Sequence, residues 1–117
     1  MKKNIKMKCN IGISFFVPRG EVKVAFLRKD DNTYIGNVII CEYEDYIEVI
    51  YIYVAKKYRG NGFAKLLIKT LQSKYDYIIT GWEDSSEEGK DLFLKMGFKL
   101  KVPLKKGLLK SLEWKKK

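Results

Sequence analysis

The chain has 117 residues, 46% of them hydrophobic and 14% aromatic, which suits one folded domain and argues against intrinsic disorder. A formal net charge of +10 favours an anionic partner, namely a nucleic acid, a membrane surface or a phosphate-rich cofactor, unless it reflects only a lysine-rich composition. Without histidine, and with two distant cysteines, Cys9 and Cys41, the sequence excludes His-based catalytic triads, predicts no metal site, and indicates reduced thiols in a cytoplasmic protein.

The first half of the chain predicts an antiparallel meander. Alternating apolar residues and short turn sequences indicate four strands, over residues 9–17, 21–29, 33–44 and 45–55. Pro18-Arg19-Gly20 is the expected turn between the first two strands. No stretch approaches the length needed to span a membrane, so no membrane partner is expected.

The second half predicts two helices and three further strands. The first helix, residues 62–73, has one apolar stripe formed by Phe63, Leu66, Leu67, Thr70 and Leu71. A second helix is expected to open at Ser85, which has capping-box spacing to Glu88, and to end before Gly97. The expected strands are residues 77–82, 98–104 and 108–114.

Together these elements predict one α+β domain over residues 1–117. It has a mixed sheet of about seven strands and two main helices. A strand, a helix and another strand in succession imply a parallel pair with a crossover.

The segment YRGNGFAK, residues 58–65, places two glycines between a strand and a helix. A helix N-terminus has unpaired N–H groups and the positive end of the helix dipole, and glycines let an anion approach the backbone closely. The segment is therefore interpreted either as a phosphate-binding loop or as an ordinary glycine-containing loop. It is neither a Walker P-loop nor a Rossmann fingerprint, because the residues that complete those motifs are missing.

Two motifs make the sequence resemble the GNAT family of acetyl-CoA-dependent N-acetyltransferases. That family's Arg/Gln-x-x-Gly-x-Gly/Ala motif is matched by Arg59, Gly62 and Ala64, after the strand that ends Ile52-Tyr53-Val54. A later helix that ends in Gly-Phe is matched by LFLKMGFK, residues 92–99. The resemblance covers roughly residues 33–100 and implies a GNAT-like fold with acetyl-CoA as cofactor.

The resemblance also implies residue roles. The N–H of Val54 would hydrogen-bond the thioester carbonyl and stabilise its developing negative charge. Pantetheine would lie between the fourth and fifth strands and pair with the backbone as an additional strand, and backbone amides from Arg59 to Ala64 would hold the pyrophosphate. The cofactor-binding residues are then Ile52, Tyr53, Val54, Arg59, Gly60, Asn61, Gly62, Phe63, Ala64, Lys65, Ser86 and Phe93.

Glu48 is the predicted general base, because the substrate ammonium must lose a proton and no histidine is present. Family members that act on histones carry their base at this place. Glu48 lies six residues before Val54, so period-two alternation predicts that both lie on one face of the strand. The alternative is that Glu48 is a solvent-facing residue of an alternating strand.

The sequence departs from the family at two places. Many members have tyrosine, which can protonate the leaving thiolate, where this chain has Phe93; Tyr51, Tyr53, Tyr58 or solvent could replace it, or activity is weak or absent. The family's usual helices between strands one and two are also missing, since only Pro18-Arg19-Gly20 joins those strands. The acceptor side is therefore expected to be open and to suit a large acceptor.

The predicted function is transfer of an acetyl group from acetyl-CoA to an amine, on a protein or another large acceptor, by direct attack in a ternary complex. The alternative is a non-catalytic module with this fold that binds coenzyme A or docks on a partner. Nucleic acid is disfavoured as a partner, because the aromatic residues follow strand alternation and no recognition motif is present. Acidic residues gather around the fourth strand, at Glu42, Glu44, Asp45 and Glu48, where they could attract a basic acceptor.

Overall fold

The computed structural model describes residues 11–13, 17–19, 22–29, 33–83, 85–102 and 109–117. Its strands are β1 (Ile11–Ile13), β2 (Val17–Arg19), β3 (Val22–Lys29), β4 (Tyr34–Glu42), β5 (Ile47–Val54), β6 (Tyr77–Gly81), β7 (Lys99–Lys101) and β8 (Ser111–Lys115). Its helices are the 3-10 turn η1 (Lys56–Tyr58), α2 (Phe63–Lys74) and α3 (Glu87–Lys95). No helix among the described residues is long and apolar enough to cross a membrane.

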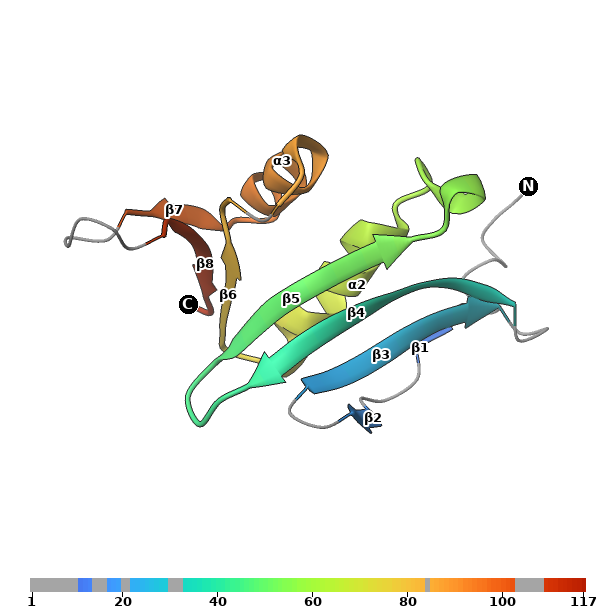
Figure 1. Ribbon diagram of the computed structural model, residues 1–117, viewed down its shortest axis with the longest axis horizontal. Coiled ribbons are helices and arrows are strands. Elements are labelled where there is room, and N and C mark those ends of the chain that lie inside the picture. Colours follow the sequence, from blue (N-terminus) through green and yellow to red (C-terminus); the bar gives the residue numbers. More distant parts are fainter. Residues whose placement is uncertain (1–10, 14–16, 20–21, 30–32, 84, 103–108) are drawn as a thin grey trace.

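All the strands belong to one mixed sheet in the order β1-β3-β4-β5-β6-β8-β7, with β2 also paired to β3 (Figure 1). The predicted meander is confirmed, because β3, β4 and β5 pair antiparallel in sequence order. The predicted crossover is confirmed as well, since β5 and β6 pair in parallel and α2 connects them. The chain then closes with β8 between β6 and β7.

The N-terminal strand differs from the prediction. Two short strands replace it, β1 opposite residues 27–29 of β3 and β2 opposite residues 22–24. Because β4 occupies the other edge of β3, β1 and β2 share one edge, so the sheet has about the predicted number of strand positions. Pro18 and Arg19 lie in β2 rather than in a turn. Proline is tolerated there because β2 is an edge strand.

The part of the chain that the structure describes contains no helix between β2 and β3, which are separated by two residues. The α+β architecture, a mixed sheet with two main helices, is therefore as predicted. Near the C-terminus β7 covers Lys99–Lys101 of the expected 98–104 strand, and residues 103–104 and the turn expected at 105–107 lie outside the described residues.

The predicted start of α3 is displaced by one residue. Ser86, not Ser85, is the N-cap, because the Ser86 Oγ accepts a hydrogen bond from the Gly89 N–H at 3.0 Å. Ser85 instead donates its hydroxyl to the Gly81 carbonyl at 2.7 Å, which ties the loop to the end of β6.

The core lies between one face of the sheet and the two helices. Leu67, Ile68 and Leu71 of α2 pack in the same buried cluster as Phe93 of α3. The Gln72 side chain donates to the Met96 carbonyl at 2.8 Å and joins α2 to the end of α3. The apolar stripe predicted for α2 is thus the surface that binds the helix to the sheet.

A β-bulge in β5 changes which residues face this core. Ile39 pairs with Tyr51 and Ile40 pairs with Val49, so Ile50 is an extra residue on β5. A bulge reverses the alternation beyond it. Val49 and Val54 accordingly both belong to the core cluster although they are five residues apart.

The prediction that Glu48 and Val54 share a face is therefore wrong. Glu48 pairs laterally with Cys41 and Ile79 on the face opposite the core, whereas the Val54 side chain is 9% exposed within the core. The face that carries Glu48, Tyr51 and Tyr53 has neither α2 nor α3 packed on it, because both helices contribute to the cluster on the other side.

Candidate functional site

The C-terminal half of β5 has an unpaired edge. In the described part of the chain, the β5–β6 ladder consists of three residue pairs, Ile47–Ile78, Glu48–Ile79 and Val49–Thr80, and β5 continues to Val54 without a described neighbour on that side. Figure 1 shows the two strands starting side by side and diverging. At the fork, the buried Thr80 hydroxyl donates to the Val49 carbonyl at 3.0 Å, so a side chain holds the last paired position.

The backbone of Val54 faces this unpaired edge. The next residue, Ala55, donates its N–H to the Ile35 carbonyl at 2.7 Å, on the side of β4. Backbone groups of consecutive strand residues point to opposite edges, so the N–H and C=O of Val54 point away from β4. The same alternation directs the N–H of Ile52 to the same edge, which can therefore accept a ligand as an additional strand.

The loop between β5 and α2 offers unpaired backbone donors. No carbonyl or side chain in the described part of the chain accepts a hydrogen bond from the N–H groups of residues 60–65, while the next N–H, of Leu66, donates to the Gly62 carbonyl. α2 has no side-chain cap and no acidic residue in its first turn, so the positive end of its dipole is not neutralised. These groups fit an anion such as a pyrophosphate.

Gly60 and Gly62 give the loop its shape. Both have φ of +82°, a left-handed conformation that strongly favours glycine, and Gly62 is the N-cap of α2. A Cβ at either position would meet no atom of the described residues within 4 Å. Asn61 stabilises the turn with its side-chain amide, which donates to the carbonyls of Tyr58 and Arg59.

Arg59 points back toward the sheet. Its Nε donates to the Val54 carbonyl at 2.8 Å, and its guanidinium carbon lies 5.5 Å from the centre of the Tyr53 ring. Phe63 packs edge-on against Tyr58 at 6.3 Å between ring centres, which fixes the start of α2. The predicted loop residues Arg59 to Lys65 thus lie together beside the end of β5.

Glu48 lies on the helix-free face of the sheet. Its Oε1 accepts a hydrogen bond from the Tyr43 hydroxyl at 3.5 Å. Tyr51, which is 52% exposed, stacks against Tyr53 along the same face at 6.2 Å between ring centres. At about 3.3 Å per residue, the separation of Glu48 from Val54 along β5 is on the order of 20 Å. Glu48 and the Val54 N–H are therefore not in direct contact.

Phe93 and Ser86, which were predicted to bind the cofactor, make contacts within the protein. Phe93 is 3% exposed and packs edge-on against Phe98 at 4.9 Å between ring centres, so a ligand entering from solvent meets little of its ring. The Ser86 hydroxyl accepts from Gly89 as the cap of α3. Phe93 belongs to the same buried cluster as Val54, and Phe63 packs against that cluster.

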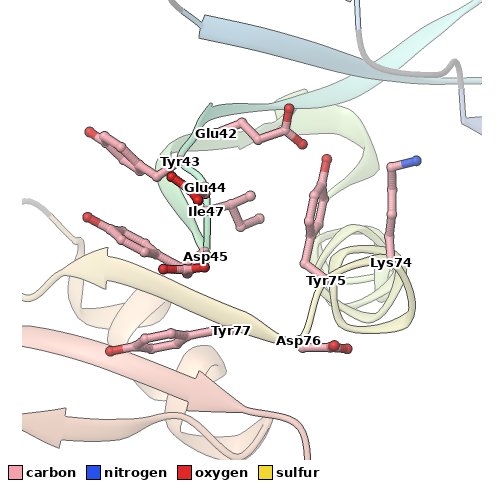
Figure 2. Close-up of a pocket in the computed structure, with 10 residues that line it drawn as sticks. Glu42, Tyr43, Glu44, Asp45, Ile47, Lys74, Tyr75, Asp76 and Tyr77 are labelled. Carbon is pink, nitrogen blue, oxygen red and sulfur yellow. The ribbon is translucent and has the colours of Figure 1, made fainter.

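A pocket of about 530 Å³ lies near the other end of α2, between the β4–β5 turn and the segment that joins α2 to β6 (Figure 2). Tyr46 stacks on Tyr43 at 4.7 Å and lies 5.6 Å from Tyr77, so three aromatic rings form one side. Its lining residues are Glu42, Tyr43, Glu44, Asp45, Tyr46, Ile47, Lys74, Tyr75, Asp76 and Tyr77. Burial, followed by the Glu42 carboxylate, raises the pKa of Tyr75 to about 12.

A family model described as an acetyltransferase (GNAT) domain matches residues 21–100, more than half of the chain. The chain belongs to the GNAT acetyltransferase family. A comparison with curated proteins gave no match.

Solved structures of GNAT proteins have the same fold. A GNAT family acetyltransferase from Elizabethkingia anophelis with acetyl-CoA bound has a TM-score of 0.72 at 17% identity, over 91% of this chain and 98% of that one. A Bacillus subtilis acetyltransferase in complex with CoA has a TM-score of 0.65 at 14% identity, over 88% and 95%. The PaiA N-acetyltransferase of Thermoplasma acidophilum, in complex with coenzyme A, has a TM-score of 0.65 at 19% identity, over 81% and 61%.

One site residue of this GNAT protein escaped the sequence analysis. Gly36 of β4 lies opposite Val54, and a Cβ there would stand 2.2 Å from the Tyr53 carbonyl oxygen, too close for any side chain. The sequence does contain an indication of this contact, because a single glycine inside a strand pattern indicates a bulge or a close backbone approach. Gly36 therefore lets β4 approach the part of β5 that carries the unpaired edge.

Proposed function

We propose that this GNAT protein transfers an acetyl group from acetyl-CoA to an amine. The observation that carries the proposal is the run of unpaired N–H groups of residues 60–65 beside the unpaired edge of β5. The N–H groups of residues 60–65 fit a pyrophosphate. The unpaired edge of β5 fits a pantetheine chain that pairs with the backbone as a strand would. Acetyl-CoA carries both groups.

Val54 is proposed to stabilise the reaction's developing charge. When the amine attacks the thioester, negative charge grows on the carbonyl oxygen, and an N–H directed at that oxygen lowers the barrier. The Val54 N–H points to the unpaired edge, and the Ile52 N–H points the same way from two residues nearer Glu48. Ile52, Tyr53 and Val54 hold the pantetheine segment in this proposal.

Glu48 is proposed to act as the general base through water. The separation along β5 rules out direct contact between Glu48 and an amine at Val54, so the proton passes along a chain of several hydrogen-bonded waters on the helix-free face. The Tyr43 hydroxyl orients the carboxylate. The amine then attacks acetyl-CoA directly, with both substrates bound.

A protein or another large, basic acceptor fits this surface. The face that carries Glu48 is not covered by α2 or α3, and the pocket beside Tyr43 is lined by four carboxylates and one lysine. Carboxylates and tyrosine rings together attract ammonium and guanidinium groups. We propose the cytoplasm as the location, where acetyl-CoA and reduced thiols would both be available.

A second function, binding of coenzyme A without catalysis, is favoured by one observation. Phe93 has no hydroxyl to protonate the departing thiolate, and its ring is buried against Phe98. In the catalytic proposal, solvent or one of Tyr51, Tyr53 and Tyr58 supplies that proton.

Thermal unfolding with acetyl-CoA tests the cofactor assignment. Saturating acetyl-CoA raises the melting temperature by mass action, whereas S-acetyl-pantetheine, which lacks the pyrophosphate, raises it much less. Gly62→Glu places a negative side chain at a left-handed position beside the loop amides, so the acetyl-CoA shift disappears. A full shift in that variant contradicts the pyrophosphate assignment.

Mass spectrometry after incubation with acetyl-CoA and cell lysates tests catalysis and identifies the acceptor. New acetyl groups on amines, absent without the protein, support the transferase. Binding of acetyl-CoA with no acetylated product supports the non-catalytic module.

A further inference from the structure

The peptide unit between Val54 and Ala55 is held from both sides. On the side of β4, the Ala55 N–H donates to the Ile35 carbonyl at 2.7 Å. On the other edge, where no described strand pairs with Val54, the Arg59 Nε donates to the Val54 carbonyl at 2.8 Å. Arg59 therefore supplies the hydrogen bond that a neighbouring strand would otherwise make.

The guanidinium retains donors after making this bond. Arginine has five N–H donors in a planar group, and the contact with Val54 uses one of them. The guanidinium carbon lies over the Tyr53 ring at 5.5 Å from its centre, a cation–π distance. The remaining N–H donors have no other hydrogen-bond partner among the described residues, so they can still donate to an anion.

We propose that Arg59 is a positioning residue, which fixes the Val54–Ala55 peptide unit against the anion-binding loop. This inference rests on the proposed function and goes beyond it, because it assigns Arg59 two separable tasks. Its charge attracts the pyrophosphate. Its Nε–H holds the Val54 carbonyl, which limits rotation about the Val54 Cα and so the direction of the Val54 N–H in the preceding peptide unit. Arg59 therefore contributes both to binding of the phosphates and to the position of the thioester.

Two variants separate the tasks. In Arg59→Gln, the amide nitrogen stands the same number of bonds from Cα as the arginine Nε, so it can donate to the Val54 carbonyl without carrying a charge. Arg59→Ala removes both the donor and the charge. Lys69→Gln is the matched charge control, because it removes one positive charge from the exposed side of α2, away from Val54.

Two acetyl donors complete the design. Acetyl-CoA has the pyrophosphate, and S-acetyl-pantetheine has the same thioester without it. With S-acetyl-pantetheine, Arg59→Ala lowers kcat about tenfold, the effect of losing one hydrogen bond from a charged group, and Arg59→Gln restores most of that loss. With acetyl-CoA, both variants raise KM, and only Arg59→Ala also lowers kcat strongly. Lys69→Gln changes neither donor's parameters.

Two results overturn the proposal. If Arg59→Ala matches the wild type with S-acetyl-pantetheine, Arg59 acts on the phosphates alone. If Arg59→Gln is as slow as Arg59→Ala with that donor, the contact with Val54 does not set the rate.

Hydrogen exchange tests the contact between Arg59 and Val54 independently of catalysis. If the wild-type protein transfers no acetyl group, the proposed function is refuted, but the exchange experiment still tests the positioning role of Arg59. The Ala55 N–H belongs to the peptide unit that Arg59 holds. Arg59→Ala accelerates its exchange about tenfold, while Arg59→Gln and Lys69→Gln leave it near the wild-type rate. Unchanged exchange of Ala55 in Arg59→Ala overturns the positioning role.

Discussion

Gly36→Ala tests whether the close approach of β4 to β5 supports the site. The added Cβ would stand 2.2 Å from the Tyr53 carbonyl oxygen and 3.1 Å from the Val54 Cα. Both neighbours are backbone atoms, which cannot rotate away as the end of a long side chain can. The strands must therefore separate by about 1 Å at this point, since non-bonded carbon and oxygen normally stay more than about 3 Å apart.

The loss of stability in Gly36→Ala follows from the contacts that are disturbed when β4 and β5 separate. Overpacking of this kind costs about 1–3 kcal/mol. Weakening the adjacent bond from the Ala55 N–H to the Ile35 carbonyl adds about 1 kcal/mol. We expect Gly36→Ala to lower the free energy of unfolding by about 2–4 kcal/mol. For a chain of this length, that is a fall in melting temperature of roughly 6–20 °C.

Urea denaturation followed by circular dichroism measures this change, with Gly89→Ala as the matched control. Gly89 lies within α3, where a Cβ would meet only the side chains of Ser86, at 3.2 Å, and Ser85, at 3.9 Å. Alanine is the better helix former by about 1 kcal/mol, so the control stays within about 1 kcal/mol of the wild type. A Gly36→Ala protein within 0.5 kcal/mol, roughly the error of such measurements, refutes the close-approach argument.

Three further predictions follow from the contacts of single side chains. Glu48→Gln keeps the size of the side chain and lowers kcat about 10²- to 10⁴-fold, with the acetyl-CoA melting shift retained; near wild-type turnover shows that another group is the base. Phe93→Tyr places a hydroxyl in a site that is 3% exposed, so stopped-flow turnover changes less than about tenfold and stability falls by about 1 kcal/mol; a larger rate increase shows that thiolate protonation limits the wild type. Tyr75 has its pKa raised from 10.0 to about 12, so its neutral form stabilises the fold fully below pH 10, and this stabilisation is lost as the pH rises toward 12. In urea titrations, the free energy of unfolding of Tyr75→Phe should fall less steeply than that of the wild type between those pH values; equal slopes contradict the assignment.

The sequence by itself determined the element types and the chemistry of the loop. A change from period two to period 3.6 marked the passage from β5 to α2, because burial of one face imposes those periods on strands and helices. Glycines at positions 60 and 62 indicated a helix N-terminus with exposed amides, since the left-handed conformation favours glycine strongly. These properties depend on residues close together in the chain, so one sequence is enough to find them.

The tertiary structure decided what depends on the partner of each strand. Between the pairs Ile39–Tyr51 and Ile40–Val49, β5 has one residue more than β4, and this extra residue is Ile50. The sequence of either strand taken alone does not reveal this difference. The bulge at Ile50 moved Val54 to the core face and left Glu48 on the other. The need for glycine at Gly36 has the same origin, because the atom that excludes a side chain belongs to the neighbouring strand.

The partners of Arg59 and Phe93 were also settled in three dimensions. Sequence analysis gave Arg59 a positive charge beside a phosphate site, whereas the structure turns its Nε toward the Val54 carbonyl. Phe93 stood out because it lacks a hydroxyl, yet its burial against Phe98 depends on how α3 packs on the sheet. A side chain's type limits the bonds it can form, but which of them forms depends on the groups that folding brings within reach, and those come from distant parts of the chain.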